Sequence, residues 1–202
     1  MSKKPVIVFE GIEGSGKSYH ITNVSRYLKK NKIDHIKIRE PGGSLNAEKI
    51  RKLILSNKSN FNQDTDLLLY LAARSENIKL LRKYYKKKII LIDRFVDSTI
   101  AYQHYGLGVN INLINTINNY LLKNFKIDFT FLNIVSKKNM IKRLKSRRSL
   151  NRYDKFKSNF YQKVQKGFLT LSDKKKKYQI IDSNLDIKMN KSLIINKLIK
   201  LI

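Results

Sequence analysis

Some residue types are absent from this sequence or scarce in it, and each gap narrows what the chain can do. The 202 residues include no cysteine, which excludes disulfides, thiolate metal sites and cysteine nucleophiles. No run of about 18 apolar residues occurs, so no membrane-spanning helix is expected. The three histidines, His20, His35 and His104, are too scattered to suggest a metal site.

Acidic residues are also scarce, because 15 Asp and Glu stand against 43 Lys and Arg, for a net charge of +28. Such a field attracts polyanions, which makes nucleic acid a candidate partner. The basic residues are spread along the chain, however, and runs such as 86–88 and 174–177 lie where predicted helices end. Cations are favourable there, so we favour a dispersed compositional bias over a nucleic-acid-binding patch.

The organisation of the chain is simple. Its length suits one domain with a sizeable core, and no low-complexity linker or internal repeat is visible. Residues 1–5 run directly into the first predicted strand and leave no room for a signal peptide. We therefore expect a single domain over residues 1–202, located in the cytoplasm.

Apolar, β-branched runs alternate with helical patterns. The strands are expected at 6–10, 35–39, 88–93, 128–135 and 178–182. Helices are expected at 19–31, 45–56, 65–85, 111–124, 137–147, 155–174 and 191–202. This alternation predicts an α/β fold with a five-stranded parallel sheet covered by helices on both faces.

One segment carries a specific chemical signal. Residues 11–18 read GIEGSGKS and match G-x-x-x-x-G-K-[ST], the phosphate-binding loop, between a predicted strand and a predicted helix. Lys17 is expected to reach nucleotide phosphates, and the Ser18 hydroxyl to ligate Mg²⁺. The segment predicts a nucleotide-binding site made of Gly11, Ile12, Glu13, Gly14, Ser15, Gly16, Lys17 and Ser18.

Polar residues stand at the ends of the predicted strands, where ligands bind in parallel sheets. Glu10 precedes the loop, and Arg39 follows the second strand. Asp93 and Arg94 follow the buried third strand, so Asp93 is a candidate magnesium ligand beside Ser18. The alternative is an ordinary Asp–Arg ion pair at a strand end.

Four segments together resemble the bacterial thymidylate kinase family. They are FEGIEGSGKS at 9–18, REPGGS at 39–44, YLAAR at 70–74 and DRFVDSTIAYQ at 93–103. The resemblance implies a P-loop NTPase-type three-layer fold with a short lid, and a homodimer. It also implies transfer of the γ-phosphoryl of Mg-ATP to dTMP, giving dTDP, with Lys17, Asp93, Arg94 and Arg147 as catalytic residues.

The resemblance also assigns residues to the phosphate and the sugar of the acceptor. Arg39 and Arg94 resemble the clamps on the dTMP phosphate, a role that suits the forked guanidinium. Glu13 resembles the family carboxylate near the 3′-hydroxyl. Tyr102 resembles the aromatic that fills the space of a ribose 2′-hydroxyl. Without the resemblance, Arg39 reads as a surface arginine beside a turn.

The base-binding residues follow in the same way. Tyr70 stands where the family has a stacking aromatic, usually phenylalanine, although its spacing alone favours core packing. Arg74 lies one helical turn later on the same face. An arginine on an apolar face needs a partner, and a base carbonyl would serve. Thr99 and Gln103 resemble the residues that line the base edge.

The lid is expected at residues 143–154, a segment rich in arginine. By resemblance it supplies the cation that reaches the transferring phosphoryl on closure. Arg147 is the first candidate, with Arg143 and Arg152 in support; the alternative is a solvated basic helix end. Asn133 departs from the family, which often has aspartate there, and adenine recognition has no signature.

Two rival functions stay open on the sequence. The chain could act on dUMP or on thymidine instead, although two phosphate-clamping arginines, Arg39 and Arg94, favour an acceptor that already carries a phosphate. The other rival is a nucleotide-dependent nucleic-acid-binding protein, which predicts steeply salt-dependent binding. The segments at 39–44 and 93–103 favour a mononucleotide site instead. In addition, the sequence shows no set of aromatic residues that would stack on nucleic-acid bases.

Overall fold

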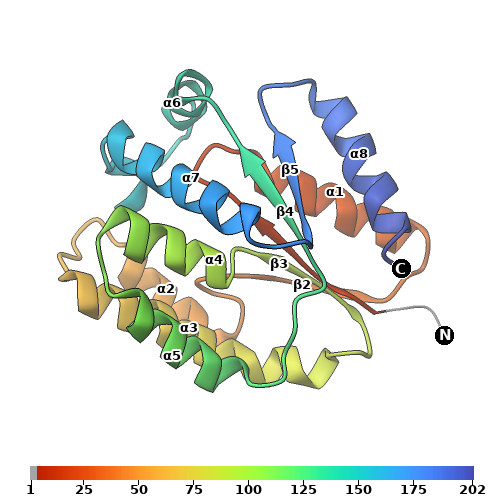
Figure 1. Ribbon diagram of the computed structural model, residues 1–202, viewed down its shortest axis with the longest axis horizontal. Coiled ribbons are helices and arrows are strands. Elements are labelled where there is room, and N and C mark those ends of the chain that lie inside the picture. The colour runs from red at the N-terminus through yellow and green to blue at the C-terminus, as the bar shows by residue number, and fades with distance from the viewer. Residues whose placement is uncertain (1–3) are drawn as a thin grey trace.

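The computed structural model describes residues 4–202, and a five-stranded sheet lies at its centre (Figure 1). All neighbouring strands are parallel, in the order β2-β3-β1-β4-β5. The strands are β1 (Val6–Glu10), β2 (His35–Arg39), β3 (Ile89–Asp93), β4 (Phe129–Ile134) and β5 (Tyr178–Asp182).

Helices connect the strands, as parallel pairing requires. The α-helices are α1 (Lys17–Lys30), α2 (Leu45–Leu55), α3 (Gln63–Tyr84), α4 (Val96–Thr99), α5 (Ile111–Leu122), α6 (Lys137–Lys145), α7 (Ser158–Asp173) and α8 (Ile187–Ile199). A π-helical segment, η1 (Ile100–Gly106), continues α4, and a 3₁₀ turn, η2 (Tyr153–Lys155), precedes α7. Within residues 4–202, none of the helices has both the length and the apolar character needed to cross a membrane.

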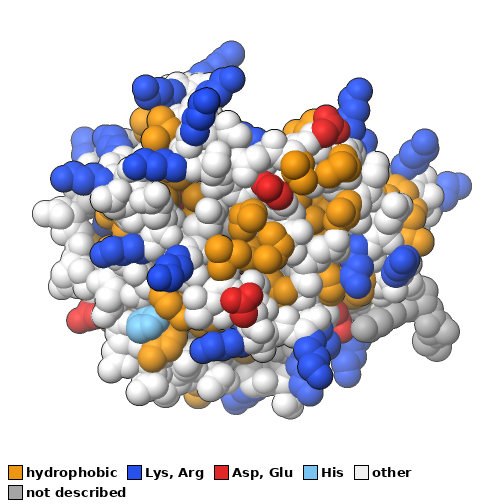
Figure 2. Space-filling model, turned by 45° about the horizontal axis from the view of Figure 1, so that its top comes forward, with side chains coloured by type: hydrophobic (Ala, Val, Ile, Leu, Met, Phe, Trp, Pro, Cys, Tyr) orange, Lys and Arg blue, Asp and Glu red, His pale blue; other side chains and the backbone are white. Residues whose placement is uncertain are grey.

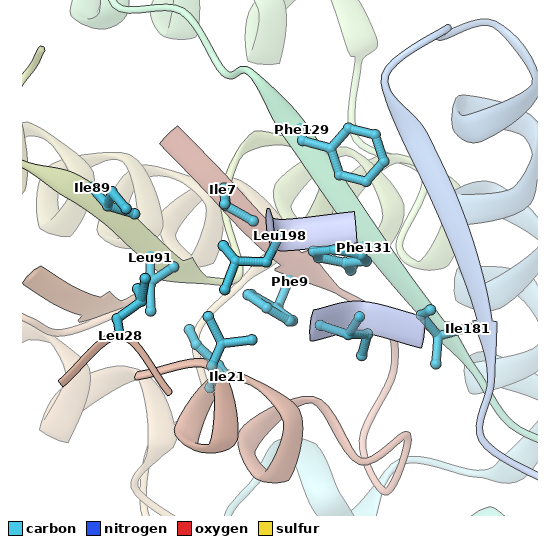
Figure 3. Packing of buried hydrophobic residues seen from close by; sticks show 12 residues of the cluster. Ile7, Phe9, Ile21, Leu28, Ile89, Leu91, Phe129, Phe131, Ile181 and Leu198 are labelled. Atoms are coloured by element: carbon cyan, nitrogen blue, oxygen red, sulfur yellow. The ribbon is translucent and has the colours of Figure 1, made fainter. Parts of the chain in front are cut away.

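One face of the sheet is covered by α1 and α8 (Figure 1). Figure 3 shows the core between them, where Ile7 and Phe9 of β1 and Phe131 of β4 meet Leu28 of α1 and Leu198 of α8. All five side chains are fully buried. Burying apolar side chains of this size contributes about 1.5–3 kcal/mol each relative to exposure, so this layer holds the helix that begins at Lys17.

The opposite face of the sheet packs against α3, because side chains alternate along a strand. Val6 and Val8 of β1 share this core with Ile90 and Ile92 of β3 and with Leu81 of α3. The sheet is therefore buried on both sides, which explains the continuous apolar runs in the sequence.

The five strands confirm the predicted α/β sheet, with boundaries within a residue or two of those expected. Helix α7 begins at Ser158, three residues after the expected start, and two further helical segments differ. The residues of α4 and η1, read in sequence only as a motif, form a continuous helical segment across 96–106. The last helix begins at Ile187, four residues before the expected start, because the Asp186 carboxylate caps it by accepting from the amides of Lys188 and Met189.

Candidate active site

A cavity of about 400 Å³ lies at the carboxyl ends of β1 and β3, where parallel sheets bind ligands. Its wall combines the phosphate-binding loop with α2, α3, η1 and the segment after α6. The residues predicted from the sequence that line it are Glu13, Gly14, Ser15, Gly16, Lys17, Ser18, Arg39, Tyr70, Arg74, Asp93, Arg94, Thr99, Tyr102, Gln103, Arg143 and Arg147. Gly11, Ile12 and Arg152 are not among the lining residues.

The loop depends on glycine at its first position. Gly11 has φ +135°, and a Cβ placed there would lie 2.2 Å from the backbone oxygen of Asn133 on β4. Gly16 caps α1 in a left-handed conformation. These two glycines let the chain turn tightly enough to direct amide groups and a helix N-terminus at one point.

Lys17 is folded back onto its own loop. Its Nζ donates to the carbonyls of Gly11 (2.8 Å) and Ile12 (2.9 Å). Burial, aided by the charge of Arg94, lowers the pKa of Lys17 to about 8. The ammonium group thus lies in a desolvated position where a polyanion would be a strong partner.

Ser18 and Asp93 meet as expected for a magnesium site. The Ser18 hydroxyl donates to Asp93 Oδ2 over 3.2 Å, across the gap between α1 and β3. A hydroxyl and a carboxylate are oxygen donors that suit Mg²⁺. Residues 4–202 contain no cluster of three or more His, Asp or Glu that would hold a metal alone. These two oxygen donors would fit a magnesium ion.

Arg94 lines the cavity and has a strained backbone conformation, with φ +66°. Its guanidinium donates to the carbonyl of Gly11 (2.9 Å) and to Glu13 Oε1 (2.8 Å). It also lies 5.0 Å from the centre of the Tyr102 ring, whose hydroxyl donates to Glu13. Burial acts to raise the pKa of Glu13, but Arg94 and Lys17 outweigh it and lower that pKa.

Glu10 explains how Arg94 is held in this conformation. Its carboxylate accepts from the amides of Phe95 (2.8 Å) and Ser98 (3.2 Å) and from the Ser98 hydroxyl (2.5 Å). Burial, together with the nearby charge of Asp97, raises the pKa of Glu10 to about 7. The sequence showed Glu10 only as a polar residue at a strand end; its partners lie more than 80 positions away.

Two further arginines border the cavity at α2. Arg39 is half-exposed and forms an ion pair with Glu48 (3.0 Å). Arg51 donates to the carbonyl of Pro41 (2.6 Å) and has no carboxylate partner of its own in the described structure. Sequence reasoning missed Arg51; the only available signal was its place on the helix that follows REPGGS.

Arg74 and Thr99, two of the residues expected at the base edge, are hydrogen-bonded to each other. Arg74 is 1% exposed and donates to Glu40 (2.8 Å), Asn118 (2.6 Å) and Thr99 (3.0 Å). The sequence suggested a base carbonyl as the partner that Arg74 needs. The structure corrects this point, because Glu40 supplies the countercharge from within the protein.

Tyr70 and Gln103 both contact Tyr153, which sequence reasoning also missed. The Tyr70 ring meets Tyr153 edge-on, with 5.8 Å between centres. The Gln103 Nε2 donates to the Tyr153 hydroxyl (3.2 Å), whereas Gln103 Oε1 has no partner in the described structure. Tyr153 carried little sequence signal, since it is one aromatic residue in a basic segment.

The three predicted lid arginines have different partners. Arg143 donates to the carbonyls of Gly14 (2.8 Å) and Ser183 (2.6 Å), which joins α6 to the phosphate-binding loop. Arg147 lines the cavity and forms an ion pair with Asp154. Arg152 turns away and pairs with Asp66 on α3. The structure therefore brings Arg143 and Arg147 to the site and does not bring Arg152.

Asn133, the residue that departs from the family pattern, lies directly behind the loop. It is fully buried, its Nδ2 donates weakly to Ser183 Oγ (3.5 Å), and its Oδ1 has no partner in the described part of the chain. Its backbone oxygen is the atom that forbids a side chain at Gly11. Asn133 thus shapes the loop through its main chain.

One cavity holds a phosphate-binding loop, a hydroxyl–carboxylate pair that would suit magnesium, and a second cluster of arginines. This combination is typical of a P-loop kinase that acts on a phosphorylated acceptor. A family model described as thymidylate kinase matches residues 9–194. The chain belongs to the thymidylate kinase family. This confirms the resemblance, the kinase activity and the P-loop NTPase-type fold expected from the sequence.

Individual relatives agree with this assignment. The chain is 37% identical to a thymidylate kinase from Thermosipho africanus, over 90% of each chain. It is 38% identical to one from Mycoplasma capricolum subsp. capricolum, over 90% of this chain and 88% of that one. A crystal structure of thymidylate kinase from Ehrlichia chaffeensis superimposes with a TM-score of 0.77 at 30% identity, covering 96% of this chain and 97% of that one.

Proposed function

We propose that the chain transfers the γ-phosphoryl group of Mg-ATP to dTMP, giving dTDP and ADP. The observation that carries this proposal is the pairing of two cationic sites in one cavity. Lys17 and the loop amides form one, and Arg94 with Arg39 and Arg51 forms the other. Phosphoryl transfer needs two polyanions held in line with their charge neutralised, and little covalent catalysis.

On the donor side, the phosphates of ATP would take the place of the two loop carbonyls as partners of Lys17. The exchange is favourable, because the buried ammonium gains anionic partners. Ser18 and Asp93 would hold Mg²⁺, which when bound neutralises charge on the phosphates. Gly14, Ser15 and Gly16 supply amides at the N-terminus of α1.

On the acceptor side, Arg94 is the central phosphate clamp, because Glu10 and Glu13 already fix its position. Arg51 is the second, since it is part of the wall without a carboxylate partner in the described structure. Arg39 would have to leave Glu48 to join them; both side chains are partly exposed, so this exchange is inexpensive.

The sugar and the base would lie beyond that phosphate. Glu13 and Tyr102 are hydrogen-bonded to each other beside Arg94, which suits contact with the 3′-hydroxyl and exclusion of a 2′-hydroxyl. Tyr70 offers a ring face for stacking. Thr99 and Gln103 present polar atoms to the base edge, with Arg74 behind Thr99.

The lid would supply positive charge on closure. Arg147 is the residue that we assign to the transferring phosphoryl group, because it lines the cavity. Its one ion pair in the described structure is with Asp154. Arg143 is bound to Gly14 and would instead hold the loop in shape. Arg152 would act elsewhere, as a partner of Asp66.

We further propose that one domain over residues 1–202 carries the activity, with its lid at 143–154, and that the enzyme is a cytoplasmic homodimer. Exposed apolar side chains support the dimer, namely Leu68 on α3 and Leu113 and Tyr120 on α5. The two helices pack against each other. The basic residues, by contrast, are scattered over the face in Figure 2 and form no single stripe for nucleic acid there.

A coupled assay of ADP release with Mg-ATP tests the function, with dTMP, dUMP, UMP and thymidine as acceptors. We expect dTMP to be the best substrate. Slower turnover of dUMP is expected, because a missing methyl group costs only about 1–3 kcal/mol. Arg94→Ala should abolish most of this turnover, whereas Arg26→Ala on α1 should leave it intact. Folded protein that binds ATP without dTMP-dependent ADP release would refute the proposal.

A further inference from the structure

A chain of buried hydrogen bonds leads from the lid to the wall of the acceptor pocket. The Tyr153 hydroxyl donates to Asp66 Oδ2 over 2.5 Å, and Gln103 Nε2 donates to the Tyr153 hydroxyl over 3.2 Å. Asp66, Tyr153 and Gln103 are 3%, 2% and 0% exposed. Gln103 is part of the cavity wall, and its Oε1 is the one polar side-chain atom of the three residues without a partner in the described structure.

The direction of this chain is dictated by its first member. A carboxylate accepts hydrogen bonds and donates none. The other oxygen of Asp66 accepts from the guanidinium of Arg152. Burial, with Tyr70 and Asp66 nearby, raises the pKa of Tyr153 well above its usual value, so the hydroxyl keeps its proton. That single proton goes to Asp66, and the oxygen of Tyr153 can then only accept.

The amide of Gln103 therefore has one favourable orientation. Its Nε2 faces Tyr153, and its Oε1 is left as a buried acceptor without a partner in the described structure, on a residue that lines the cavity. The reverse orientation would set Oε1 against the Tyr153 oxygen, two acceptors with no proton between them. The amide of a glutamine can present either its NH₂ group or its oxygen to a ligand. Here Asp66, through Tyr153, determines that the oxygen is presented.

We propose that Asp66 and Tyr153 are positioning residues that orient the Gln103 amide and so select an acceptor base with an N–H donor at ring position 3. The inference rests on the proposed function and deepens it. Thymine and uracil carry that donor, whereas cytosine carries a lone pair. A cytosine base would leave two acceptors facing each other in a desolvated site, which costs far more than a missing methyl group.

This chain of hydrogen bonds from Asp66 through Tyr153 to Gln103, the relay, also gives Arg152 a role that differs from contact with phosphate. It supplies the countercharge for Asp66 and donates from Nε to the carbonyl of Ile54 (3.1 Å). Because Arg152 and Tyr153 are adjacent, the end of the lid and the base pocket share one anchor.

Asp66→Asn is the sharpest test, since it keeps the shape and reverses the relay. Arg152 requires an acceptor, so the oxygen of the introduced amide would turn to it and the NH₂ group would face Tyr153. The Tyr153 hydroxyl would then accept from that NH₂ group and donate to Gln103. The Gln103 amide would turn over and present Nε2 to the base.

The readout is the ratio of the dissociation constants of dCMP and dTMP, measured by titration calorimetry, beside kcat/KM for both. We expect the wild type to favour dTMP at least about 100-fold. Asp66→Asn should lower this preference about 100-fold, with tighter dCMP binding. Tyr153→Phe removes the hydroxyl that orients the Gln103 amide, and it should lower the preference for dTMP over dCMP about 10-fold. Asp34→Asn, at an exposed pair with Lys88, should leave it unchanged.

Equal weakening of dTMP and dCMP in both variants would overturn the inference and reduce Asp66 and Tyr153 to structural roles. An unchanged ratio in Tyr153→Phe would overturn it even if Asp66→Asn failed to fold. A wild type that binds dTMP selectively but does not phosphorylate it would refute the proposed function and leave the relay standing.

Discussion

The donor and acceptor halves of the cavity are built in opposite ways. The donor half comes from eight consecutive residues together with Asp93. Gly11 and the start of α1 shape its main chain, and Lys17 and Ser18 supply its side chains. The acceptor half is assembled from α2, α3, η1 and the lid, and its side chains are paired with one another. Local sequence thus fixes where ATP phosphates would lie, and tertiary contacts fix which acceptor is chosen.

The two halves meet at Arg94, which touches the carbonyl of Gly11 on one side and Glu13 on the other. Glu10 ties the same segment to β1 through two amides. A change in the donor half should therefore spare acceptor binding, and a change at the junction should disturb both.

Lys17→Ala should break the donor half alone and give the largest effect. We expect kcat with dTMP to fall by about 10³-fold or more, because a preorganised cation at the transferring phosphate is lost. Binding of dTMP, followed by calorimetry without ATP, should stay within about 2-fold of the wild type. A comparable loss of dTMP binding would show that the halves are not separable.

Arg147→Ala should act on the transition state through the lid. The expected result is a fall of about 10²-fold in kcat with little change in KM for dTMP, since the proposed contact of Arg147 is with the transferring phosphoryl group and not with dTMP. Arg148→Ala is the matched control, because that neighbour is exposed and does not line the cavity. If the control proved as damaging as Arg147→Ala, the assignment within the lid would be wrong.

Glu10→Gln should change how the free energy of unfolding depends on pH, which tests the part that Glu10 plays where the two halves meet. The folded pKa of about 7 exceeds the ordinary 4.5, so the folded state keeps a proton that the unfolded chain releases. This contribution to stability is complete below about pH 4.5 and is lost as the pH rises through 7. Urea unfolding at several pH values should show wild type losing about 3 kcal/mol relative to the variant over this range, because a difference of one in pKa corresponds to about 1.4 kcal/mol. Parallel stability curves for the two proteins would contradict the buried, protonatable Glu10.

Nucleotide binding should be coupled to a fraction of a proton, the smallest of these effects. Lys17 has a pKa of about 8 in the free protein, and phosphate contact would raise it. At about pH 8.5, ATP binding should therefore take up protons, measured by calorimetry in two buffers of different ionisation enthalpy. Lys17→Gln should remove this uptake; persistence in that variant would assign the proton to another group.

The fold and the donor site were largely predictable from sequence. Parallel strands buried on both faces leave a plain apolar signal, and the phosphate-binding loop is contiguous, so its neighbours in sequence are its neighbours in space. The pairing of Ser18 with Asp93 followed from the rule that strand ends gather at one edge.

The rest of the site depends on contacts that sequence does not display. Arg74 read as needing a ligand until its pairing with Glu40, 34 positions away, was visible. Arg152 was expected, by resemblance, to support Arg147 in the lid, yet it forms an ion pair with Asp66, 86 positions away. The π-helical turn of η1 was missed, since no periodicity of 3.6 or 2 describes it.

The proposed reaction in this cavity is the transfer of a phosphoryl group from ATP to dTMP. Phosphorus NMR of the protein with Mg-ATP and dTMP observes that event directly. We expect resonances of dTDP and ADP to grow together in equal amounts while those of ATP and dTMP decline. Formation of ADP and free phosphate at a rate independent of dTMP, with no dTDP, would contradict it.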